Sequence, residues 1–130
     1  IIDALVDTVG MADRLEWEGP EIMLGPRGAM SLSLLLHELG TNALKYGAWS
    51  SPEGLVKVRW SVDNSGLEAM LEFSWTEFGG PVPKEPDRRG FGSRLIQLGL
   101  LGTGGVTLSY NPPGFSAKMS AAIQQLQQAT

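Results

Sequence analysis

The sequence of 130 residues contains no cysteine, which excludes disulfides, thiolate metal sites and cysteine nucleophiles. No apolar run approaches the roughly 20 residues that a membrane-spanning helix needs, and no signal-peptide pattern opens the chain. Basic residues number 10 against 14 acidic ones, for a net charge of −4, whereas nucleic-acid-binding modules carry a basic surplus. These absences favour a cytoplasmic domain that contacts neither nucleic acid nor a membrane.

The length is that of one domain, so we expect residues 1–130 to form a single unit. The chain opens on Ile1 rather than Met, as a fragment of a longer protein would. Residues 1–10, closed by Gly10, are expected to form a helical lead-in. Residues 122–130 are polar and are expected to fray.

The pattern of hydrophobic residues and turn signals predicts helices and strands in alternation. A helix rich in Leu and Ala is expected over Arg27–Gly47. The alternating stretches Leu55–Val62 and Leu67–Trp75 flank the turn Asp63-Asn64-Ser65-Gly66, the clearest hairpin signal in the chain. The remaining expectations are short strands over 14–18 and 21–24, an irregular segment over 77–92, a short helix over 91–101, and a second hairpin over 106–121. This order predicts an α+β fold, a two-layer sandwich with a mixed, mostly antiparallel sheet and helices on one face.

The long helix is expected to carry polar groups on one face. Glu38, Asn42 and Lys45 are spaced four and three residues apart, so they share that face, with His37 and Thr41 beside it. The side expected to enter the core carries Leu32, Leu35, Leu36, Leu39, Ala43 and Tyr46. One interpretation is a solvated polar face, as on most amphipathic helices. The other is a ligand site, because carboxylate and carboxamide oxygens suit a hydrated Mg²⁺ and a lysine suits phosphate.

Two glycine-containing turns form the second candidate element. Trp75-Thr76-Glu77-Phe78-Gly79-Gly80 ends a strand, and its glycines would let the backbone approach a planar ligand, while Glu77 could accept a hydrogen bond from an exocyclic amine such as that of adenine. Farther along, Arg88-Arg89-Gly90-Phe91-Gly92-Ser93-Arg94 leads into a helix, whose N-terminal N–H groups would bind phosphate. Alone, this second run is equally compatible with a mobile surface loop.

Three segments in order resemble the HWE family of sensor histidine kinases, specifically their catalytic ATP-binding domain. HELGTNALKYGA (residues 37–48) resembles the family's N box, WTEFGGP (75–81) its Trp-x-Glu element, and GFGSRLI (90–96) its second glycine box. The eponymous residues correspond to His37, Trp75 and Glu77. Position 40 is Gly where the family usually has Ala, and position 49 is Trp where we expect Leu.

The resemblance implies a Bergerat (GHKL) ATPase fold that binds ATP and Mg²⁺ and transfers the γ-phosphate to a histidine. By this resemblance Glu38 acts as acid or base, or orients a water on the metal, and Asn42 holds Mg²⁺. Glu77 reads adenine and Gly79 leaves room for the base, while Arg94 is our own addition as a phosphate contact. The residues expected to contact nucleotide are Asn42, Lys45, Tyr46, Glu77, Gly79, Gly80, Arg89, Gly90, Phe91, Gly92, Ser93 and Arg94.

His37 is the sole histidine of the chain, yet the resemblance implies that the phosphoacceptor lies upstream on separate dimerisation helices. We therefore assign His37 a catalytic supporting role, positioning Glu38 or packing at the edge of the site. The partners implied are those helices, a downstream response regulator and, in the full-length protein, a second copy in a homodimer. Two alternatives remain: another ATPase or an anti-sigma-factor-like serine kinase on the same fold, and a non-catalytic module that holds nucleotide or only docks a partner.

Overall fold

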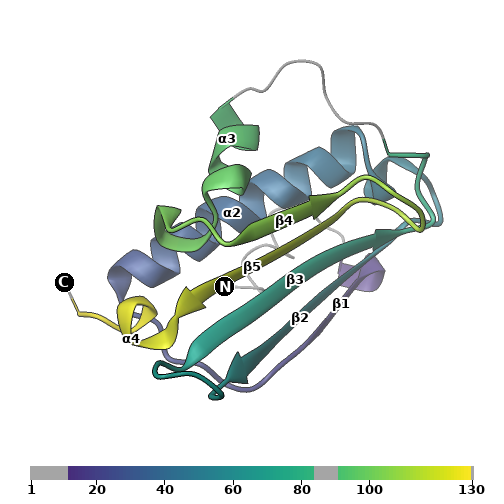
Figure 1. Cartoon of the computed structure of the whole chain (residues 1–130). Helices are drawn as coiled ribbons and strands as arrows, with labels where there is room; N and C mark the ends of the chain where they lie inside the picture. The colour runs from purple at the N-terminus through teal and green to yellow at the C-terminus, as the bar shows by residue number, and fades with distance from the viewer. Residues whose placement is uncertain (1–11, 84–90, 130) are drawn as a thin grey trace.

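The computed structural model describes residues 12–83 and 91–129, which form one sheet with helices on one face (Figure 1). The predicted lead-in over residues 1–10 lies outside the described residues. In chain order, the elements are η1 (Ala12–Arg14), β1 (Leu15–Glu18), α2 (Pro26–Lys45), η2 (Ala48–Ser50), β2 (Leu55–Asp63), β3 (Met70–Phe78), α3 (Phe91–Leu98), η3 (Leu100–Gly102), β4 (Val106–Ser109), β5 (Ser116–Ala122) and α4 (Ile123–Leu126).

The sheet has the strand order β1-β2-β3-β5-β4. β1 pairs with β2 in parallel, and all other neighbours are antiparallel. In Figure 1, α2 and α3 lie on the same side of this sheet. The predicted α+β class, the mixed and mostly antiparallel sheet and the single helical layer are confirmed.

The long helix α2 begins with Pro26 at its first position, where the missing N–H costs nothing and the fixed φ suits a helix. It ends at Lys45, where the N–H groups of Tyr46 and Gly47 both donate to the carbonyl of Asn42. Its inner face buries Leu35, Leu36, Leu39 and Ala43 against the sheet. Helix and hairpin periodicity therefore predicted the central scaffold, although β3 begins three residues later than expected, at Met70, and continues to Phe78.

Tyr46 departs from its predicted place on the buried side of the helix. It lies one residue beyond α2, with φ −130° and ψ −16°, and its side chain is 71% exposed. The reason is that the chain has already left the helical path, so positions counted on a helical wheel no longer apply there.

The predicted strand over residues 21–24 is absent, since the described structure has no regular element between β1 and α2. The Trp60 indole N–H donates to the carbonyl of Pro20 (2.6 Å), and the Gly25 N–H donates to the carbonyl of Leu126 (2.8 Å). This connection therefore takes backbone hydrogen bonds from a side chain and from the C-terminal segment instead of from a strand.

The C-terminal segment does not fray at its start, contrary to prediction. Residues 123–126 form α4, and the Leu126 side chain is fully buried. A Cβ atom on Gly28 would lie 2.4 Å from the Leu126 carbonyl oxygen, so the first turn of α2 needs glycine to let this segment approach. The polar composition of the tail concealed one apolar anchor.

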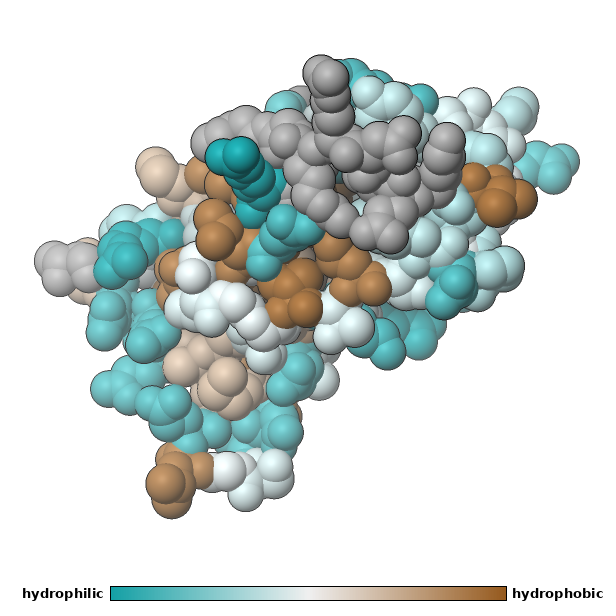
Figure 2. All heavy atoms as spheres, turned by 45° about the horizontal axis from the view of Figure 1, so that its top comes forward, coloured by the Kyte–Doolittle hydropathy of each residue, from teal (hydrophilic) through white to brown (hydrophobic). Residues whose placement is uncertain are grey.

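Two further features concern the hydrophobic residues of the helices. Within the described ranges, no helix combines the length and hydrophobicity needed to span a bilayer. Figure 2, which turns the top of Figure 1 forward, shows hydrophobic side chains exposed among hydrophilic ones. Among the described side chains of α2 and α3, the exposed large hydrophobic residues are Met30, Leu34 and Leu98.

Candidate functional site

One edge of α2 carries the predicted polar residues beside α3. Glu38 and Asn42 are half-buried, and they follow Ser31 by seven and eleven residues, close to whole numbers of helical turns. The Ser31 hydroxyl accepts a hydrogen bond from the Leu101 N–H (2.8 Å), in the turn that follows α3, and α2 and α3 are in contact. Glu38 and Asn42 thus continue the edge that faces the α3 segment, which a fully solvated face would not do.

Their predicted neighbours are more exposed. The side chains of His37 and Lys45 are exposed, and the Thr41 hydroxyl donates to the backbone carbonyl of His37 (2.8 Å). Among residues 12–83 and 91–129 no ion pair engages Lys45 or Arg94. Both cations can therefore meet an anionic ligand without breaking a described salt bridge.

Glu77 occupies a different place from the irregular turn that was predicted. It lies within β3, opposite Val56 of β2, and it is only 3% exposed. Its Oε1 accepts the Ala48 N–H and its Oε2 accepts the Trp75 indole N–H, both at 2.9 Å. Burial raises the pKa of this carboxyl, and the hydrogen bonds from Trp75 and Ala48 oppose that rise. Whether Glu77 also reads adenine stays a prediction.

The glycines after β3 are required by contacts within the protein. Gly79 has a φ of +74°, a conformation that favours glycine, and a Cβ there would lie 3.0 Å from the Glu53 carbonyl oxygen. A Cβ on Gly80 would lie 2.6 Å from the Ala48 Cα. The 47–54 segment therefore occupies the space that these missing side chains leave. Contact of either glycine with a base stays a prediction.

The second glycine run is described only in part. Arg89 and Gly90 lie outside the described residues. The backbone of Phe91, Gly92 and Ser93 forms the first turn of α3, and Arg94 follows with an exposed side chain. A helix start is thus present where the sequence predicted one.

The residues on α2 fit a hydrated Mg²⁺ and a nucleotide. Glu38 and Asn42 offer one carboxylate and one carboxamide on a half-buried edge. In the described part of the chain no three His, Cys, Asp or Glu side chains converge as a protein-only metal cage. Mg²⁺ is commonly held by one or two protein oxygens together with waters and substrate phosphates, so this donor set matches a metal that arrives with ATP.

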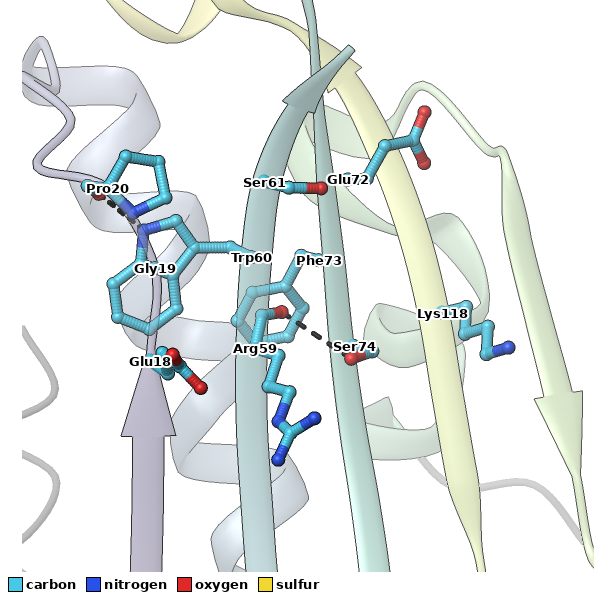
Figure 3. Close-up of a pocket in the computed structure, with 10 residues that line it drawn as sticks. All are labelled: Glu18, Gly19, Pro20, Arg59, Trp60, Ser61, Glu72, Phe73, Ser74 and Lys118. Atoms are coloured by element: carbon cyan, nitrogen blue, oxygen red, sulfur yellow. Dashed lines mark hydrogen bonds between the residues drawn. The ribbon is translucent and has the colours of Figure 1, made fainter.

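A shallow hollow on the opposite face of the sheet is a separate feature. Figure 3 views it with the helices behind the strands. Its lining includes the outward side chains of Arg59, Ser74 and Lys118, while Trp60 leans toward Gly19 and Pro20 at its border. Because it is on the face without helices, it does not include the α2 residues predicted to bind nucleotide.

Sequence reasoning missed the residues that hold the turn after α2. The indole N–H of Trp49 donates to the Arg14 carbonyl (2.9 Å), and the ring of Trp49 packs edge-on against Trp75, with centroids 5.7 Å apart and planes at 76°. The available signal was the tryptophan at position 49, where the family resemblance led us to expect Leu.

Comparison with known proteins shows that the chain is similar in sequence to histidine kinases. No family model matches the chain. The blue-light-activated histidine kinase of Brucella anthropi is 45% identical over 89 residues, covering 68% of this chain and 18% of that protein. The enzyme of the same name from Brucella ovis is 39% identical over 85 residues, covering 65% and 17%. The chain therefore spans about a fifth of the length of these relatives.

Solved structures give the same result for the fold. The histidine kinase domain of the Erythrobacter litoralis blue-light-activated histidine kinase matches 95% of this chain and 58% of that one, with a TM-score of 0.71 and 19% identity. A longer structure of the same enzyme matches 95% and 41%, with a TM-score of 0.72 and 18% identity. These findings confirm the resemblance seen in the sequence: the chain belongs to the histidine kinase family, as a relative of HWE-type catalytic domains.

Proposed function

We propose that this chain binds Mg-ATP and transfers the γ-phosphate to a histidine on separate dimerisation helices. The observation that carries the proposal is the half-buried pair Glu38 and Asn42, on the edge of α2 that Ser31 joins to the segment after α3. The sequence similarity to histidine kinases supports the proposal. Without it, the composition of this edge would fit the polar face of any amphipathic helix equally well.

The proposed roles follow from chemistry. Asn42 would supply its carboxamide oxygen to Mg²⁺, and Lys45 and Arg94 would contact phosphate oxygens. Bound Mg²⁺ neutralises phosphate charge during transfer. Glu38 accepts a proton at its carboxylate from the attacking imidazole, or orients a water. Positioning and electrostatics supply most of the rate.

Three further parts of the proposal concern the nucleotide and the wider protein. Glu77 accepts a hydrogen bond from the adenine amine through a remaining lone pair. The phosphoryl group passes from the acceptor histidine to a response regulator, and the parent kinase is a cytoplasmic homodimer. His37 supports Glu38 and is not itself phosphorylated, because the acceptor is carried by another domain.

The test is titration of Asn42→Ala with ATP, with and without Mg²⁺, by calorimetry. We expect the Mg²⁺-dependent part of the ATP affinity to disappear, because Asn42 is the proposed ligand of the metal. Asn64→Ala makes the same change in the exposed β2–β3 turn and should bind as the wild type does. Mg²⁺-dependent affinity that survives in Asn42→Ala would refute the metal-ligand role.

The alternative functions give different outcomes. If the wild-type chain binds no nucleotide at millimolar ATP, a docking module is favoured over a kinase. If it binds ATP but phosphoamino-acid analysis of the transferred product finds phosphoserine, a serine kinase on the same fold is favoured.

A further inference from the structure

The Glu77 carboxylate lies beneath the turn that ends α2. A Cβ atom on Gly47 would lie 2.1 Å from Glu77 Oε1, so only glycine leaves room for the carboxylate at this point. The same oxygen accepts the N–H of the next residue, Ala48. Carboxylate and turn therefore meet at contact distance.

The second oxygen of the carboxylate is held from the other side. Trp75 and Glu77 are two residues apart on β3, so both side chains point toward the helices. Trp75 is fully buried, and its indole N–H donates to Oε2. The edge-on contact with Trp49 and the bond from Trp49 to Arg14 continue the packing. The indole thus sets where the carboxylate lies.

The turn that contains Gly47 and Ala48 directly follows the end of α2 that is proposed to bind nucleotide. The carbonyl of Asn42 accepts the N–H groups of Tyr46 (2.8 Å) and Gly47 (3.1 Å). A shift of Gly47 and Ala48 would therefore pull on the last turn of the helix, which carries both Asn42 and Lys45.

We propose that Glu77 is a positioning residue: its carboxylate, oriented by the Trp75 indole, holds Gly47 and Ala48 and thereby sets the placement of Asn42 and Lys45 for Mg-ATP. This inference rests on the proposed function for its consequence, whereas the link from Glu77 to Asn42 is a property of the folded chain alone. The proposal explains why a Trp and a Glu stand two residues apart on one face of the strand, because the two side chains form a single hydrogen-bonded unit. This role is distinct from contact with adenine.

Two variants test whether the hydrogen-bonded carboxylate matters for Mg-ATP binding. Glu77→Gln keeps the shape but offers an NH₂ group to one of two N–H donors, so one hydrogen bond is lost. Trp75→Phe removes the indole N–H and leaves the carboxylate untouched. We expect each variant to weaken Mg-ATP binding about tenfold, the usual scale for one hydrogen bond to a charged group. A loss in Trp75→Phe shows that the orientation of the carboxylate matters, and the choice of nucleotide then separates positioning from contact with the base.

The choice of nucleotide sharpens the comparison. Mg-ITP carries a carbonyl in place of the exocyclic amine of adenine, so Glu77 cannot accept a hydrogen bond from it at that position. Positioning predicts that Glu77→Gln loses affinity for Mg-ITP as well as for Mg-ATP, whatever contact with the adenine amine adds for Mg-ATP. A loss confined to Mg-ATP would overturn the inference. Matched controls are Glu72→Gln, exposed on the same strand, and Trp60→Phe, whose indole donates to Pro20.

A readout without nucleotide keeps the two proposals distinguishable. In ¹H–¹⁵N spectra of the free protein we expect Glu77→Gln and Trp75→Phe to shift the Ala48 amide and, with it, the Asn42 side-chain amide signals. Asn42 signals that stay in place in both variants would overturn the inference whether or not ATP binds. If these signals move but the wild type binds no Mg-ATP, the proposed function fails and the link stands. Thermal unfolding of each variant establishes that the spectra come from folded protein.

Discussion

Arg14 and Trp49 hold each other through reciprocal hydrogen bonds. The Trp49 indole N–H donates to the Arg14 carbonyl, and the Arg14 guanidinium donates to the Trp49 carbonyl at 3.4 Å. The same guanidinium also donates to the carbonyls of Ser51 and Gly54. The N–H groups of this one guanidinium therefore organise the loop between α2 and β2, which also donates the Ala48 N–H to Glu77.

The first prediction concerns the stability that the Arg14 guanidinium provides. Arg14→Lys replaces a planar group that reaches three carbonyls with a single ammonium. We expect the free energy of unfolding to fall by about 1–3 kcal/mol, because carbonyls in this loop lose donors. Urea unfolding measures it. Arg27→Lys is the control, since Arg27 is exposed on the first turn of α2. Equal stability of the two variants would contradict the organising role of Arg14.

The second prediction concerns the pH dependence that Glu77 contributes to stability. Burial raises the pKa of this carboxyl above the ordinary value of a glutamate. The folded state then holds the proton more tightly than the unfolded state, so Glu77 contributes stability that is fully present below about pH 4.5 and is lost as the pH rises through the folded pKa. We expect wild type to lose stability relative to Glu77→Gln across that window.

Urea unfolding of both proteins at a series of pH values checks this second prediction. Glu72→Gln removes an exposed carboxyl from the same strand and should track the wild type. A stability difference between wild type and Glu77→Gln that stays constant, or that moves in favour of the wild type as pH rises, would contradict the direction of the pKa shift.

The third prediction separates binding from chemistry at Glu38. Glu38→Gln keeps the size of the side chain but cannot accept a proton, so we expect phosphoryl transfer to a histidine domain to slow by roughly 10²- to 10⁴-fold. The Mg-ATP dissociation constant should change little, because Asn42 and Lys45 remain. Single-turnover transfer from labelled ATP gives the rate. Glu68→Gln, in the exposed β2–β3 turn, should transfer normally. An unchanged rate for Glu38→Gln would remove the acid–base role.

Local patterns predicted the elements whose hydrogen bonds are local. The α2 helix and the β2–β3 hairpin follow from periodicity and one turn signal, because helical hydrogen bonds join residues four apart and the two strands are consecutive in the chain. Glu38 and Asn42 share a helix face for the same reason. The segments that resemble the N box, the Trp-x-Glu element and the glycine box are each contiguous in the sequence. The resemblance to the family could therefore be recognised without a structure.

Contacts between distant segments depended on the tertiary structure. The parallel pairing of β1 with β2, the burial of Leu126 against α2 and the exposure of Tyr46 depend on which segments meet in space. Glu77 is the clearest case: an acidic residue between a strand and two glycines reads as a turn, but Trp75 and Ala48 supply N–H donors that make its burial tolerable. The sequence carried the chemistry of each group, and only the fold decided which partner each group would have.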